Sequence, residues 1–93
     1  MNFSEDQLKE IEDMAGLFFS AGDIAVNLEL NEEETETFGF QISSKNTSFP
    51  EVTAYLKGRL TAEIVMRKAI KQSAQNGSSP SQQQMLHFLK DSK

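Results

Sequence analysis

Residues 19–34 read FSAGDIAVNLELNEEE, and this short stretch contains two helix starts. At each start a short polar side chain, Ser20 or Asn31, can accept a hydrogen bond from the backbone N–H three residues further on. The acidic run after Asn31 falls in the first turn of its helix, where negative charge complements the helix dipole. The stretch therefore predicts a short helix, a tight turn and another helix, as in a helix-turn-helix.

A further helix is predicted ahead of this stretch, over residues 4–19. Ser4 can cap it, and Phe3 can pack on an apolar residue just inside the helix. Apolar residues at helical spacing predict the inward faces of all three helices; these residues are Leu8, Ile11, Met14, Ala15, Phe18, Ile24, Ala25, Leu28, Phe38 and Ile42. Phe3, Phe19 and Phe49 are also expected at caps or in the core, whereas Phe40 is expected at the surface.

A long helix is predicted from about Phe49 to Gln75, after a polar break at residues 45–48. Pro50 fits the first turn of this helix, and the Asn-Gly pair at residues 76–77 is typical of a left-handed helix end. A capping box at residues 79–82 predicts a short last helix that folds back antiparallel on the long one. No alternating strand pattern occurs, so the chain is predicted to be all-α.

The predicted organisation is an N-terminal three-helix, helix-turn-helix-like bundle over residues 1–45, then the long helix and the C-terminal helix over residues 46–93. The two parts are expected to form one compact unit. The long helix carries one broad apolar arc, formed by Val52, Tyr55, Leu56, Ala62, Met66, Ala69, Ile70 and Ala74. This arc is wider than one short partner helix covers, which favours self-association through residues 46–93. Gly58, in the middle of this helix, permits either a close helix approach or a kink.

Charge is strongly segregated along the chain, although the net charge is only −5. Residues 1–51 hold 12 acidic side chains against Lys9 and Lys45, a net charge of −10. Residues 52–93 hold seven basic side chains against Glu63 and Asp91, a net charge of +5. This segregation is compatible with nucleic acid binding by the basic half, with head-to-tail assembly, or with attraction between the halves of one chain.

The long helix contains two groups of candidate binding residues. Lys57, Lys68 and Lys71 fall within a sector of about 60°, where they serve either as a solvated face or as a phosphate-binding stripe. Arg59 and Glu63 project into the apolar arc and are predicted to pair at the edge of a packed interface. The other residues assigned to an oligomer interface come from the same helix: Tyr55, Met66 and Ile70.

Catalysis is not predicted. The chain has no cysteine, and its one histidine, His87, has no convincing catalytic partner or set of metal ligands. The acidic run at residues 32–34 lacks the loop pattern of a calcium site. We expect no metal and no cofactor, no membrane span, and a cytoplasmic protein.

The order of these parts resembles small terminase subunits of tailed phages and related prophage proteins. The resemblance is carried by FSAGDIA at residues 19–25 and LELN at residues 28–31, then by residues 50–51, AYLKGRL at 54–60, residues 62–63 and 67–68, and AQNGSSPSQ at 74–82. It implies a DNA-packaging protein that contacts double-stranded DNA near residues 20–47 and self-associates through residues 50–75. It also implies a large motor subunit as a partner and the cytoplasm of a bacterial host cell as the location.

Two functional hypotheses follow. In the first, the protein is a DNA-associated assembly protein whose residues Gln41, Lys45, Asn46, Lys57, Lys68 and Lys71 contact DNA, mainly at phosphates and without strong base recognition. The acidic residues of the third helix oppose base recognition, because carboxylates repel phosphates. In the second, it is a protein-interaction module that self-associates without binding DNA.

Overall fold

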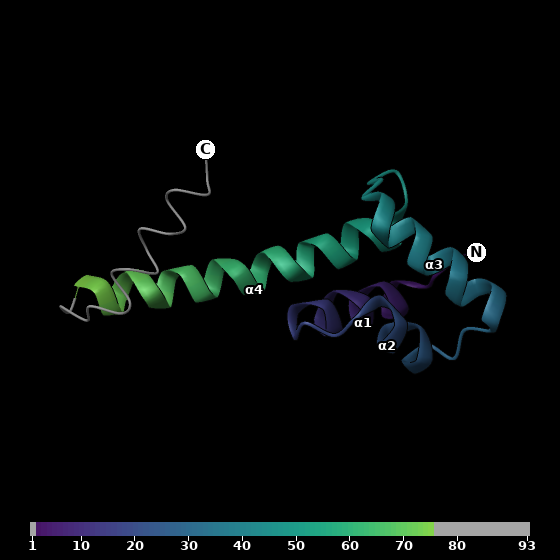
Figure 1. Ribbon diagram of the computed structural model, residues 1–93, viewed down its shortest axis with the longest axis horizontal. Helices are drawn as coiled ribbons and strands as arrows, with labels where there is room; N and C mark the ends of the chain where they lie inside the picture. The colour runs from purple at the N-terminus through teal and green to yellow at the C-terminus, as the bar shows by residue number, and fades with distance from the viewer. Residues whose placement is uncertain (1, 76–93) are drawn as a thin grey trace. The chain divides into compact units, whose positions relative to one another are not determined.

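The computed structural model describes residues 2–75, and this part of the chain is all-α, as predicted. The helices are α1 (Glu5–Gly16), α2 (Ala21–Asn27), α3 (Glu32–Ser44) and α4 (Pro50–Gln75) (Figure 1). No strand occurs in the described residues. The short C-terminal helix predicted from residue 79 onward lies outside them.

The first three helices begin at the predicted caps. The backbone N–H of Gln7 donates to Ser4 Oγ at 3.2 Å, and that of Asp23 donates to Ser20 Oγ at 3.1 Å. Asn31 forms a reciprocal capping box with Glu34, because the Asn31 side chain accepts from the Glu34 N–H at 2.8 Å and the Glu34 carboxylate accepts from the Asn31 N–H at 3.1 Å. Local side-chain chemistry therefore sets where these helices start.

The ends of α1 and α2 share one geometry, which the sequence did not reveal. Phe18 and Glu29 adopt left-handed conformations, with φ of 66° and 58°, directly after the C-cap residues Leu17 and Leu28. In α1 the next amide, of Phe19, donates to the Met14 carbonyl at 3.2 Å, which is the Schellman pattern. The prediction that the first helix continues to residue 19 is therefore wrong. Phe18 is 52% exposed instead of lying in the core, and Phe19, directly before the cap residue Ser20, is 42% exposed.

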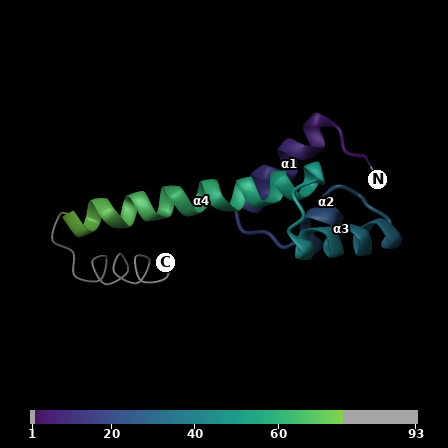
Figure 2. The same cartoon turned by 90° about the horizontal axis from the view of Figure 1, so that it is seen from above.

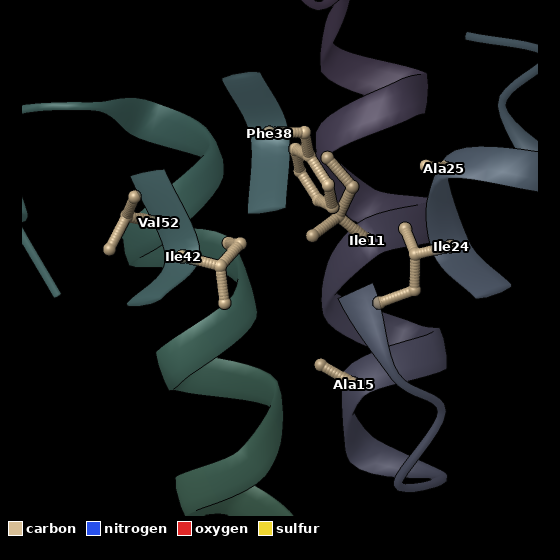
Figure 3. Packing of buried hydrophobic residues seen from close by; sticks show 7 residues of the cluster. All are labelled: Ile11, Ala15, Ile24, Ala25, Phe38, Ile42 and Val52. Carbon is tan, nitrogen blue, oxygen red and sulfur yellow. The ribbon is translucent and has the colours of Figure 1, made fainter. Parts of the chain in front are cut away.

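The core lies where α1, α2, α3 and the start of α4 meet. Phe38 of α3 packs beside Ile11 of α1, and Figure 3 shows Ile24 of α2 near the same contact. Phe3 adds an edge-on contact to the Phe38 ring, with centroids 5.9 Å apart. The buried apolar residues are Ile11, Ala15, Ile24, Ala25, Phe38, Ile42 and Val52. Six of these seven were predicted inward faces of the first three helices, and Val52 belongs to the predicted apolar arc of the long helix.

Glycines mark a close approach between α1 and α4. A Cβ added to Gly58 would collide with the carbonyl oxygen of Glu12 and lie 3.1 Å from Ala15 Cβ. A Cβ added to Gly16 of α1 would lie 3.3 Å from the Gly58 carbonyl oxygen. Of the two roles left open for Gly58, the structure supports the close approach.

The chain divides into two compact units, Met1–Ala62 and Glu63–Lys93, with the boundary inside α4. The sequence placed a boundary after residue 45 and expected a single unit. The difference arises because the start of α4 packs into the N-terminal unit, where Val52 is fully buried and Gly58 touches α1. We refer to Met1–Ala62 as the N-terminal unit.

Candidate nucleic-acid and assembly surfaces

Helices α2 and α3 form the predicted sequence of short helix, tight turn and longer helix. The turn at residues 28–31 closes as the Glu29 N–H donates to the Val26 carbonyl at 3.0 Å and the Leu30 N–H donates to the Ala25 carbonyl at 3.1 Å. The two helices pack directly against each other, and Figure 2 shows them side by side. The N-terminal unit thus contains two helices joined by a tight turn, an arrangement like that of a helix-turn-helix, and α1 packs against α2.

The surface at the start of α3 is acidic. Glu32, Glu33 and Glu36 are exposed and line one hollow together with Asn31. These carboxylates disfavour contact with a phosphate backbone. Phe40, further along α3, is 77% exposed, as predicted. The exposed part of α3 therefore combines negative charge with one large apolar side chain.

Two of the polar residues assigned to DNA contact have side-chain oxygens that are buried or locally hydrogen-bonded. The Oε1 atom of Gln41 is buried and has no hydrogen-bond partner. Asn46 Oδ1 accepts from the Ser48 N–H at 3.0 Å and from Ser48 Oγ at 2.7 Å. Burial of the Gln41 oxygen and the local bonds of the Asn46 oxygen disfavour recognition of bases by this pair.

The four lysines assigned to DNA contact are all exposed. Lys45 follows α3 in a left-handed conformation, with φ of 56°. Lys57 belongs to the start of α4 and lies 4.0 Å from Glu12, an exposed ion pair that leaves its side chain 69% accessible. Lys57 also lines an open groove with Lys9 and the hydroxyl residues Thr47, Ser48 and Thr53. Lys68 and Lys71 follow on α4. The structure brings Lys57 and Lys9 together at one groove.

Arg59 does not pair with Glu63, contrary to the prediction. Its guanidinium lies over the Phe18 ring at 5.3 Å and over the Tyr55 ring at 5.0 Å, and donates to the Phe19 carbonyl at 3.1 Å. Glu63 instead accepts from Arg67 at 2.7 Å, one helical turn further on. The physical reason is that the α1–α2 connection supplies Arg59 with a carbonyl and an aromatic face, which a planar guanidinium can use together.

The central part of α4 exposes large apolar side chains. The exposed fraction is 56% for Leu60, 44% for Ile64, 62% for Val65 and 47% for Met66. Ile70, also assigned to the oligomer interface, is half-buried. Two residues from the same assignment are half-buried in their own chain: Tyr55 packs against the core, and Arg59 contacts Phe18 and Phe19 of the α1–α2 connection. The part of the assigned interface that is free for a partner lies from residue 60 onward.

A cavity of about 440 Å³ lies in the N-terminal unit, between the chain start, α3 and the start of α4, and no sequence pattern predicted it. Glu51, only 4% exposed, lines it, and so does Gln41. Glu51 lies in the first turn of α4, where a carboxylate gains about 0.3–1 kcal/mol from the helix dipole.

Comparison of the chain with protein-family models, with curated proteins and with solved structures finds no match. Within residues 2–75, no helix has the length and apolar character needed to cross a membrane. The same residues contain no group of three or more His, Cys, Asp or Glu side chains placed to hold a metal ion.

Proposed function

We propose that this protein is a non-enzymatic, DNA-associated assembly protein of the small-terminase type. Its N-terminal unit and the lysines of α4 contact the phosphate backbone of double-stranded DNA, and α4 joins copies of the chain. The resemblance of the sequence to small terminase subunits adds a large motor subunit as a third partner.

The observation that carries the proposal is the α2–α3 helix-turn-helix, followed directly by a long helix with exposed apolar side chains. A helix-turn-helix is a common scaffold for holding a protein on duplex DNA. Exposed apolar side chains that recur along one helix are typical of a surface that another protein covers. Together these features favour a protein that binds DNA and also assembles.

The contact with DNA is expected to be electrostatic. Lys45, Lys57, Lys68 and Lys71 are exposed, whereas the side-chain oxygens of Gln41 and Asn46 are buried or already hydrogen-bonded. Lysines that neutralise phosphates release counterions and give affinity without reading bases. We therefore propose a positioning role on DNA with weak sequence preference.

A second candidate function is a protein-interaction module that assembles without DNA. The observation that favours it is the acidic surface of α3, where Glu32, Glu33 and Glu36 are all exposed. In many helix-turn-helix proteins this second helix enters the major groove. Negative charge at that place suits a basic protein partner better than it suits DNA.

Duplex binding measured at several salt concentrations separates the two functions. Fluorescence anisotropy of a labelled duplex should show an affinity that falls steeply as salt rises. The K68A/K71A variant should reduce the slope of log K against log salt by about two, or about one per lost phosphate contact. The K68R/K71R variant, which keeps both charges, should retain the slope.

An unchanged slope in K68A/K71A would show that these two lysines do not contact DNA phosphates. Absence of measurable duplex binding by the unmodified chain at physiological salt would exclude the DNA-associated function and favour the interaction module. Both lysines are exposed, so their substitution should leave the helical circular dichroism unchanged.

A further inference from the structure

The cavity beside Glu51 has the composition of a ligand site. Its volume of about 440 Å³ falls within the range of small-molecule pockets. Its lining combines apolar side chains, those of Phe3, Leu8, Phe49 and Pro50, with the polar side chains of Asn2, Gln41 and Glu51. All of these residues belong to the N-terminal unit.

The two most buried polar groups of the cavity both accept hydrogen bonds. Only 4% of the surface of Glu51 is exposed. Gln41 Oε1 is buried and has no hydrogen-bond partner. Buried acceptors are normally satisfied, so Gln41 Oε1, at the same cavity as a carboxylate, calls for a donor. A donor with positive charge would also compensate the carboxylate.

We propose that this cavity binds an organic cation, an ammonium or guanidinium group carried on an alkyl stem. The cationic head hydrogen-bonds to the Glu51 carboxylate and to Gln41 Oε1. The stem packs on Leu8 and Pro50, and the rings of Phe3 and Phe49 offer faces that attract a cation. Because guanidinium and ammonium groups have only donors, they match a site whose buried groups only accept.

Other ligand classes fit the cavity less well. Hard metal ions take six or more oxygen ligands, whereas this lining offers one carboxylate and the side-chain oxygens of Gln41 and Asn2. Anions are opposed by the charge of Glu51. The inference is independent of the proposed DNA contact, because none of the four assigned lysines lines this cavity.

The test is a titration of the isotope-labelled chain followed by NMR at constant ionic strength. Three probes are compared: n-butylguanidinium as a free cation, N-acetyl-arginine amide as a model of an arginine side chain, and n-butylurea as a neutral analogue of similar shape. We expect the first two to shift the amide signals of Phe49, Val52 and the Gln41 side chain, and n-butylurea to leave them unchanged. The cation that binds more tightly identifies the source as a free molecule or as a protein side chain.

Two variants locate the binding charge. E51Q keeps the shape of the side chain and should weaken cation binding about tenfold or more, since it removes a charge-assisted hydrogen bond. E36Q removes an exposed charge from α3 and should bind as the unmodified chain does. If E51Q does not give the helical circular dichroism of the parent, Q41L takes its place, with a smaller expected loss.

The proposal is overturned if the guanidinium and urea probes shift the same signals with equal affinity. It is also overturned if E51Q binds as tightly as E36Q, or if the shifts gather at exposed glutamates outside the cavity. Because the probe comparison uses the unmodified chain, it shows even without the variants whether the cavity prefers a cation to a neutral molecule.

Discussion

At Glu29 the backbone adopts a conformation that its side chain does not favour. The residue is exposed, has φ of 58° and closes the Schellman pattern after α2. A non-glycine residue pays about 1–2 kcal/mol in this region, while glycine loses about 0.5–1 kcal/mol more chain entropy on folding. We therefore expect E29G to raise the free energy of unfolding by about 0.5–1 kcal/mol.

Urea denaturation followed by circular dichroism measures this gain. The matched control is E29A, which removes the same charge but keeps a Cβ and should show no such gain. Equal stabilisation by E29G and E29A would assign the effect to charge and contradict the backbone argument.

At the scale of residues, the helix starts could be predicted from the sequence, whereas the ends of α1 and α2 could not. Ser4, Ser20 and Asn31 were predicted as caps because their side chains perform the capping themselves. Phe18 and Glu29 were missed because the usual signal for a left-handed helix end is glycine, and neither residue is one. Phe18 is held by contact with Arg59, a residue 41 positions away that no local pattern can identify.

At the scale of helices, two glycines provide a test of the approach between α1 and α4. Gly39 in α3 has nothing within 4 Å of an added Cβ, so G39A should gain about 1 kcal/mol of stability from helix propensity alone. At Gly58 the same Cβ meets the backbone oxygen of Glu12, and overpacking against backbone costs about 1–3 kcal/mol. We expect G58A to be less stable than the parent by up to about 2 kcal/mol, after the propensity gain is subtracted.

Thermal and urea unfolding of the two variants measure the difference. The substitutions are chemically identical and both lie inside helices, so opposite signs can come only from their surroundings. A stabilised G58A would mean that α1 and α4 are not in close contact at this position.

The order and approximate bounds of the helices could be predicted from the sequence, but their packing partners could not. The apolar spacing of α1, α2 and α3 identified six of the seven buried apolar residues. The spacing of Arg59 and Glu63 predicted an ion pair. Arg59 instead contacts the Tyr55 ring and the Phe19 carbonyl, and Glu63 pairs with Arg67. The cavity at Glu51 joins residues from three separate stretches of chain, so no single sequence pattern marks it.

At the scale of the whole molecule, the exposed apolar side chains of α4 predict self-association. Four large apolar side chains of this helix are each between 44% and 62% exposed: Leu60, Ile64, Val65 and Met66. Charge segregation along the chain also favours contact between unlike halves of different copies. Salt screens the contacts between charges but not the apolar ones. Light scattering should therefore give a mass several times that of the 10.4 kDa chain, and an oligomer that persists at high salt.

The comparison of V65E with Q72E identifies the surface responsible. Both positions are exposed on α4, and both variants add one negative charge. V65E also removes an apolar side chain whose burial contributes about 1.5 kcal/mol or more, so the dissociation constant should rise about tenfold or more. Q72E should change it much less. Equal effects of the two variants would assign association to charge, and a monomer at every salt concentration would remove assembly from the proposed function.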